Sequence, residues 1–224
     1  MSFLLARGGV APFRAMTADE VLARLGRERA IAILRTHDPG LVRPALDAAV
    51  RGGFRCLEVT LNTPGALAAV ARLAEDPALV VGAGTVLTVD DARRAVEAGA
   101  SFLVSPVVDV EVIACARSLG VVMIPGALSP TELLTAHRAG APLQKLFPAP
   151  ADGPEHIRAC LGPLPFLRLV PTSGVRLDNA LAYLGAGAFA LGFVRSLFDA
   201  DELARGAFDR VEQRARAIVD LVRS

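Results

Sequence analysis

The chain has 224 residues, 53% of them hydrophobic, which is enough for one large buried core, and no linker interrupts it. Its formal net charge of +1 and its scattered arginines leave no basic stripe for nucleic acid, so we expect no DNA or RNA partner. No apolar stretch, including the one through Phe13, is long enough to span a membrane, and three widely spaced cysteines favour a reducing cytoplasm. We therefore expect a single cytoplasmic domain over residues 1–224.

Short β-rich runs recur about every twenty to twenty-five residues, each followed by an amphipathic helical pattern, which predicts a parallel sheet. Eight such units predict a closed (β/α)8 barrel of the TIM type. A helical pattern from about Thr17 to Arg24 precedes the first strand, and we expect this extra N-terminal helix to close the bottom of the barrel. The predicted strands cover residues 30–35, 55–61, 79–85, 101–105, 121–125, 143–147, 167–171 and 188–192.

Helix-end signals fall between these strands. Capping boxes are expected from Thr17 to Glu20 and from Ser129 to Glu132, and Pro64 is expected at the first position of a helix. A last helix is expected from Phe208 to Arg223. Left-handed helix C-caps are predicted at Gly52-Gly53, Gly99, Gly120 and Gly140.

Lysine is nearly absent, because Lys145 is the only lysine among 24 lysines and arginines. It lies in the middle of the apolar run from Leu143 to Phe147, and Leu143, Lys145 and Phe147 share one face of a strand. A desolvated lysine can lose its proton near neutral pH and attack a carbonyl, whereas an arginine stays protonated. Lys145 is thus a candidate Schiff-base nucleophile; the alternative is a lysine left by arginine-rich coding bias, with its amine in water.

In such a barrel the active site lies at the C-terminal ends of the strands. Alternation along the second strand places Cys56, Glu58 and Thr60 on one face, so that Glu58 points into the barrel together with Lys145. The pair could be a structural ion pair. It could also perform aldol chemistry, in which an iminium on Lys145 accepts electrons while Glu58 moves protons through water. The polar residues at these ends are Arg35, Glu58, Thr60, Asn62, Thr85, Ser105, Lys145, Thr172 and Ser173.

Six short segments at the strand ends form an ordered set: Leu57-Glu-Val-Thr-Leu61, Val81-Gly-Ala-Gly-Thr-Val86, Val104-Ser-Pro106, Ile124-Pro-Gly126, Lys145-Leu-Phe-Pro148 and Pro171-Thr-Ser-Gly-Val175. From about Ile31 to Leu197 the set resembles the 2-keto-3-deoxy-6-phosphogluconate (KDPG) and 4-hydroxy-2-oxoglutarate (KHG) class I aldolases. The resemblance implies a homotrimeric barrel without metal or cofactor. It also implies cleavage of a phosphorylated 2-keto-3-deoxy sugar acid to pyruvate and an aldehyde such as glyceraldehyde 3-phosphate.

Residue roles follow from the same resemblance. Lys145 matches the Schiff-base lysine and Glu58 the general acid and base. Thr85 matches a threonine that hydrogen-bonds the pyruvyl carboxylate, and Thr172 matches a substrate-contacting threonine. Pro106 and Phe147 match residues that form the walls of the pyruvyl pocket. Ordinary core packing is an equal alternative for both residues.

The chain departs from the family pattern at three places. Asn62 replaces an arginine that holds the substrate carboxylate in many members, and we expect Arg35, which matches a first-strand arginine of other members, to bind that carboxylate. Ser173 replaces a glycine of the phosphate loop, where backbone N–H groups of Ser173 and Gly174 could still bind phosphate if no positive φ is needed.

The third departure follows the eighth strand, where the family shows Gly-x-Gly-Ser. Here the segment runs from Gly192 to Arg195, with Val194 in place of a glycine and Arg195 in place of the serine. Arg195 could bind the phosphate directly. Alternatively, Val194 narrows the pocket and Arg195 faces solvent, which would favour a smaller or unphosphorylated 2-keto acid. Gly192, beside this loop, is counted with the substrate-binding residues.

Three classes of function stay open. The leading hypothesis is a lysine Schiff-base aldolase for KDPG, with 2-keto-3-deoxy-6-phosphogalactonate or KHG as alternative substrates. A second class is a barrel isomerase or synthase that binds phosphate through residues 172–174 without a covalent intermediate, and a third is a non-catalytic barrel that binds a keto acid. The three histidines show no metal-ligand spacing.

Overall fold

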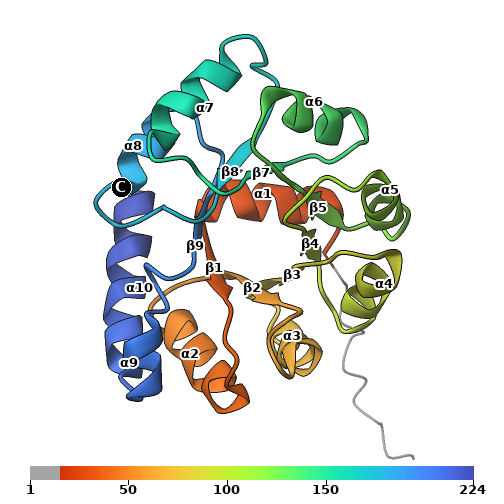
Figure 1. Ribbon diagram of the computed structural model, residues 1–224. Coiled ribbons are helices and arrows are strands. Elements are labelled where there is room, and N and C mark those ends of the chain that lie inside the picture. The colour runs from red at the N-terminus through yellow and green to blue at the C-terminus, as the bar shows by residue number, and fades with distance from the viewer. Residues whose placement is uncertain (1–15) are drawn as a thin grey trace, which may run out of the picture.

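The computed structural model describes residues 16–224, so the N-terminal stretch through Phe13 lies outside the described residues. Parallel strands surround one axis and helices cover them from outside (Figure 1). The strands are β1 (Ala30–Leu34), β2 (Cys56–Thr60), β3 (Val80–Gly84), β4 (Phe102–Val104), β5 (Val122–Ile124), β6 (Gly126–Ala127), β7 (Gln144–Leu146), β8 (Leu169–Pro171) and β9 (Leu191–Phe193). Only Pro125 separates β5 from β6, so these two segments occupy one strand position and eight positions result.

The barrel wall consists of two hydrogen-bonded sheets, ordered β5-β4-β3-β2-β1-β9 and β6-β7-β8. The chain itself joins them at Pro125, whose carbonyl accepts a hydrogen bond from the Lys145 N–H at 2.9 Å. On the other side, a bridge pairs Thr172 with Gly192 and joins β8 to β9. The predicted (β/α)8 barrel is confirmed. Its last strand begins at Leu191, because pairing with β1 starts there.

The covering helices are α2 (Pro39–Arg51), α3 (Ala66–Ala74), α4 (Val89–Glu97), α5 (Val110–Ser118), α6 (Pro130–Arg138), α7 (Gly153–Leu161), α8 (Ala180–Gly185), α9 (Ala200–Ala204) and α10 (Phe208–Arg223). The expected last helix from Phe208 to Arg223 is confirmed. None of the helices in residues 16–224 combines the length and apolar character that crossing a bilayer requires.

Most predicted helix ends are confirmed. Both capping boxes form, at Thr17 and at Ser129. The prediction for Pro64 is wrong, because the turn after β2 extends to Gly65, which has a φ of 76° and precedes the first residue of α3. The Thr63 N–H donates to the Thr60 carbonyl at 2.8 Å and so holds this turn in place of a first helical turn. Of the predicted glycine caps, Gly53, Gly99, Gly120 and Gly140 have a positive φ, whereas Gly52, with a φ of −72°, does not.

The extra helix α1 (Ala18–Glu28) closes one end of the barrel, as predicted. In Figure 1 it crosses behind the strands. Its Val21 and Leu25 are fully buried and join the cluster that fills the barrel interior, together with Phe102 of β4. Gly82 faces that ring, and a methyl group at Gly82 would lie 2.3 Å from it, so glycine is required there for packing. Within residues 16–224, this leaves the opposite end of the barrel as the one open to water and ligands.

Candidate active site

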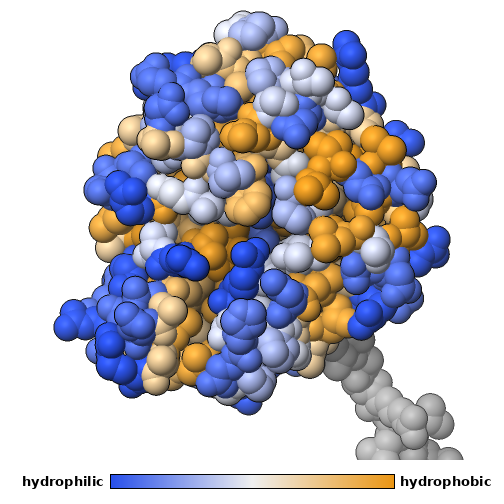
Figure 2. All heavy atoms as spheres, viewed as in Figure 1, coloured by the Kyte–Doolittle hydropathy of each residue, from blue (hydrophilic) through white to orange (hydrophobic). Residues whose placement is uncertain are grey.

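A hollow of about 620 Å³ lies at the C-terminal ends of β1, β7, β8 and β9. Figure 2 shows hydrophilic side chains around a depression near the centre of this face. The sequence-predicted residues that line the hollow are Arg35, Lys145, Phe147, Thr172, Ser173, Gly174 and Arg195. The structure thus brings together residues that are up to 160 positions apart in the chain, counted from Arg35 to Arg195 (195 − 35).

Lys145 lies in the middle of β7, where its side chain is only 5% exposed. Its Nζ atom lies 4.8 Å from the centre of the Phe147 ring, close enough for a cation–π contact when the amine is charged. Burial lowers the pKa of Lys145, the Glu58 carboxylate opposes this shift, and the Arg35 guanidinium adds to it. The lysine is therefore held in a site that favours the neutral, nucleophilic amine.

Glu58 lies on β2, is 1% exposed and, unlike Lys145, does not itself line the hollow. Burial raises its pKa, while the charges of Lys145 and Arg35 lower it. Its Oε1 atom has no hydrogen-bond partner within the described residues, so it remains available to a ligand or a water molecule. The geometry supports a carboxyl group that can both hold and release a proton.

Gly84 on β3 provides the space that the Glu58 carboxyl occupies. A methyl group at Gly84 would lie 1.9 Å from the Glu58 Oε1 atom, which no real contact allows. The register pairs Glu58 with Gly82 and Thr60 with Gly84, so the carboxyl reaches toward the C-terminal end of the neighbouring strand. The two glycines of Val81-Gly-Ala-Gly-Thr-Val86 therefore admit the Phe102 ring and the Glu58 carboxyl, respectively.

The loop after β8 takes a backbone conformation that glycine usually supplies. Ser173 has a φ of 67° and Gly174 a φ of 100°. Phosphate binding by the backbone N–H groups of Ser173 and Gly174 was expected only if Ser173 needs no positive φ, and this condition is not met. The serine adopts the left-handed conformation at a steric cost. The Asn179 side chain supports the loop by donating to the Gly174 carbonyl at 2.9 Å.

Arg35 and Arg195 are both exposed, and both line the hollow. Arg176, which the sequence did not single out, also lines it and pairs with Asp178 through two hydrogen bonds of 3.1 and 3.2 Å. Three guanidinium groups thus surround the opening above Lys145. Such an arrangement favours an anionic ligand.

The remaining predicted residues do not line the hollow. Thr85 follows β3 with a φ of 59°, a strained conformation for a β-branched residue and one that is concentrated at functional sites. Pro106 packs against Gly126, where a methyl group would lie 2.4 Å from the Pro106 carbonyl oxygen. Gly192 leaves room for the Thr172 hydroxyl, which would lie 2.5 Å from a methyl group there. Direct substrate contacts by these three residues remain predictions.

Ser196 is a site residue that the sequence analysis missed. It lines the hollow, and its hydroxyl donates to the Val175 carbonyl at 2.7 Å, which ties the loop after β9 to the loop after β8. The signal was available, because Ser196 directly follows the residue that replaces the family serine. Cys56, in the barrel interior, is no competing nucleophile, since burial raises the pKa of its thiol to about 12.

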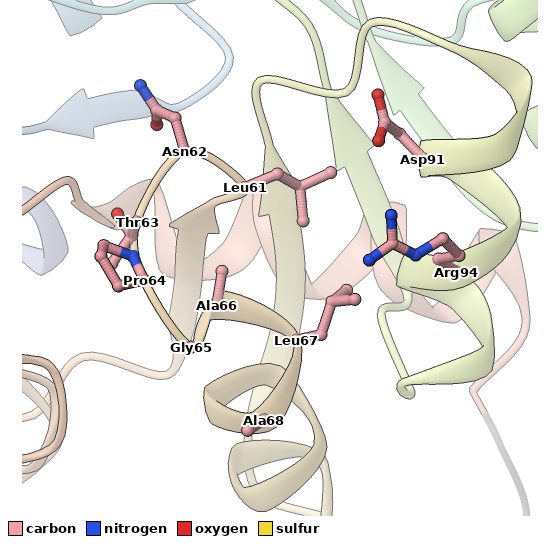
Figure 3. A pocket seen from close by; sticks show the side chains of 10 residues that line it. All are labelled: Leu61, Asn62, Thr63, Pro64, Gly65, Ala66, Leu67, Ala68, Asp91 and Arg94. Carbon is pink, nitrogen blue, oxygen red and sulfur yellow. The ribbon is translucent and has the colours of Figure 1, made fainter. Parts of the chain in front are cut away.

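A second hollow, of about 390 Å³, lies between the turn after β2 and α4 (Figure 3). Leu61 and Leu67 face Asp91 and Arg94 across it. It contains no lysine and no buried titratable pair, so it offers no candidate nucleophile for carbonyl chemistry. Within residues 16–224 no group of three or more His, Cys, Asp or Glu side chains is arranged to hold a metal ion.

Comparison with known proteins agrees with this geometry. A family model described as KDPG and KHG aldolase matches residues 21–214. A 2-dehydro-3-deoxy-phosphogluconate aldolase of Treponema pallidum is 34% identical over 209 residues, covering 92% of this chain and 98% of its own. A 2-dehydro-3-deoxy-6-phosphogalactonate aldolase of Escherichia coli is 32% identical over 197 residues, covering 86% and 94%. The crystal structure of KDPG aldolase from Legionella pneumophila, with pyruvate captured as a covalent carbinolamine, superimposes with a TM-score of 0.80 at 27% identity, covering 88% and 97%.

The conformation of Ser173 predicts a stability gain. Ser173→Gly should raise the free energy of unfolding by about 1 kcal/mol, because glycine adopts a positive φ without the steric cost. Urea denaturation measures this free energy of unfolding. Ser118→Gly, the same change at the last residue of α5, should instead lose about 1 kcal/mol. Equal losses in both variants would contradict the assigned strain.

Proposed function

Because this chain belongs to the KDPG and KHG aldolase family, whose members are carbon–carbon lyases, we propose that it cleaves a 2-keto-3-deoxy sugar acid through a Schiff base on Lys145. The observation that carries this proposal is the buried Lys145, the only lysine of the sequence, beside the buried Glu58 at the open end of the barrel. The covalent carbinolamine in the Legionella pneumophila KDPG aldolase supports the same chemistry. The barrel of residues 16–224 is the proposed functional unit, a single domain.

The first half of the reaction builds an electron acceptor. The neutral Lys145 amine attacks the keto carbon, a nitrogen–carbon bond forms, and a proton moves from nitrogen to the former carbonyl oxygen. Loss of that oxygen as water gives an iminium ion, with Glu58 supplying the proton. The raised pKa of Glu58 suits this step, because burial favours the protonated form of the carboxyl group.

The second half breaks the carbon chain. Glu58, now a carboxylate, accepts the proton of the C4 hydroxyl, the C3–C4 bond breaks, and its electrons move into the iminium to form an enamine as the aldehyde leaves. Protonation of the enamine at C3 and hydrolysis by water then release pyruvate and restore the amine. Arg35 binds the carboxylate of the keto acid during these steps through a charged, bidentate hydrogen bond.

The substrate is proposed to be phosphorylated KDPG or a close relative. Arg195 and Arg176 line the outer part of the hollow, where a phosphate at the far end of the substrate would lie. The relatives include aldolases named for both phosphogluconate and phosphogalactonate derivatives. The phosphogalactonate and KHG compounds therefore stay as alternative substrates. A non-covalent isomerase would have no use for a desolvated lysine.

We propose that the protein is cytoplasmic, because its free cysteines favour a reducing compartment. We also propose that it acts as a homotrimer. Four exposed apolar residues that are 40–55% exposed lie in or directly after the loops that follow neighbouring strands β3, β4 and β6: Leu87, Val107, Val110 and Leu128. Figure 2 shows apolar side chains gathered on this part of the face. An exposed apolar patch of this kind fits a contact between subunits.

Reduction with borohydride in the presence of pyruvate should attach a permanent adduct to Lys145, detected by peptide mass spectrometry. Lys145→Arg should gain no adduct at this position and lose cleavage, because a guanidinium keeps the charge but forms no imine. The wild-type cleavage rate should reach its plateau at a pH below 10.5, the ordinary lysine value, because burial lowers the pKa of Lys145. Cleavage by the arginine variant at the wild-type rate would refute the mechanism.

Arg195→Ser tests the phosphate contact. We expect kcat/KM for the phosphorylated substrate to fall by about tenfold or more relative to the unphosphorylated one, because a charged hydrogen bond is lost. Arg205→Ser removes an exposed arginine outside the hollow and serves as the matched control. An unchanged preference in Arg195→Ser would remove Arg195 from the site and favour a smaller substrate.

The proposed assembly is tested by light scattering after size exclusion. Val110→Asp and Leu128→Asp should each shift the mass from three chains towards one, because a buried carboxylate at the contact is costly. Leu181→Asp changes an exposed leucine of α8, away from the patch, and should leave the mass unchanged. A wild-type mass of one chain would overturn the trimer.

A further inference from the structure

Two buried threonines hold the backbone on both sides of Arg35. The Thr60 hydroxyl donates to the Leu34 carbonyl at 3.3 Å, and the Thr36 N–H donates to the Thr63 hydroxyl oxygen at 3.3 Å. The two hydroxyl oxygens lie 3.1 Å apart. Both threonine side chains are buried. Thr63 also lines the second hollow, across the turn after β2 from Asp91 and Arg94 (Figure 3).

The direction of these hydrogen bonds follows from proton counting. Each hydroxyl has one hydrogen to donate. Since Thr60 donates its hydrogen to the Leu34 carbonyl, the contact between the hydroxyls must be a donation from Thr63 to Thr60. A chain of three bonds thus runs from the Thr36 N–H through both hydroxyls to the Leu34 carbonyl. It begins and ends at the two neighbours of Arg35.

The Arg35 side chain has no such support of its own. Within residues 16–224 no hydrogen bond or ion pair holds its guanidinium, which is exposed at the edge of the hollow. Its reach towards a ligand therefore depends on where the backbone places its Cα atom. The end of β1 is fixed by strand pairing up to Leu34, which pairs with Val59. Beyond Leu34, the threonine hydroxyls supply the next anchor.

We propose that Thr60 and Thr63 are positioning residues that hold Arg35 for binding the carboxylate of the keto acid. The inference rests on the proposed function, in which Arg35 binds that carboxylate. A bidentate contact between guanidinium and carboxylate depends on geometry, so a displaced backbone weakens it without removing any group from the site. Thr63 touches no reacting atom in this proposal and acts only through Arg35.

The test compares Thr63→Val with Thr63→Ser. Valine keeps the shape of threonine but loses both hydrogen bonds of its hydroxyl, whereas serine keeps the hydroxyl. The pyruvate concentration that half-saturates borohydride labelling of Lys145 should rise about five- to tenfold in Thr63→Val. The labelling rate at saturating pyruvate should stay near the wild-type value, and Thr63→Ser should restore most of the affinity. Thr135→Val loses one hydroxyl bond on the surface of α6 and should change neither quantity.

Coupling to Arg35 separates a positioning role from general loosening. Arg35→Ala alone should raise the half-saturating pyruvate concentration at least tenfold, and adding Thr63→Val should then have little further effect. An equal effect of Thr63→Val with and without Arg35, or no effect with Arg35 present, would overturn the inference. Should Thr63→Val not fold, Thr63→Ala is measured in its place against the same predictions.

Failure of the proposed function gives a different result. If wild-type protein gains no adduct with pyruvate, the Schiff-base proposal falls and the positioning role falls with it. If the adduct forms but Arg35→Ala binds pyruvate normally, the aldolase stands and both the carboxylate role of Arg35 and the role of the threonines are refuted.

Discussion

The rest of the structure depends on one constraint, the burial of two titratable side chains, Glu58 and Lys145, inside the barrel. Glu58 and Lys145 both pay a desolvation cost when charged, and this cost raises one pKa and lowers the other. Several features exist to maintain this environment. Leu25 of α1 seals the far end of the barrel, and Gly84 leaves the space that the carboxyl fills. Burying these two groups lowers the stability of the fold at this place. In return it favours the neutral amine of Lys145 and the protonated carboxyl of Glu58, which the proposed reaction uses.

Much of the fold could be predicted because its signals are local. Alternating apolar residues located the eight strands, and the glycines after helices marked left-handed caps that the structure contains. The prediction for Pro64 failed because it used the proline alone. The turn there is set by contacts between Thr60 and Thr63, including a hydroxyl pair that also depends on the neighbouring strand. Tertiary contacts of this kind cannot be read from a helix-start pattern.

The candidate site was predicted at its centre and less well at its edge. Lys145 and Glu58 lie on strands, where alternation fixes which way a side chain points, so their shared location followed from the sequence. Ser173 lies in a loop, and its positive φ is set by loop closure that residue type alone does not reveal. Arg176 was missed for a similar reason, whereas Ser196 was missed although it directly follows Arg195. They reach the hollow from loops after β8 and β9 whose path depends on their mutual hydrogen bond.

Because α1 closes one end of the barrel, it also affects the order in which reactants bind and products leave in the proposed reaction. With Val21 and Leu25 filling one end, the described residues leave the hollow at the other end as the route for reactants and products. The pyruvyl part of the substrate is tethered at the bottom of that hollow, and the aldehyde part occupies the outer half. In the proposed reaction the aldehyde must therefore depart before pyruvate is released. In the synthetic direction the same geometry makes the keto acid the first reactant to bind.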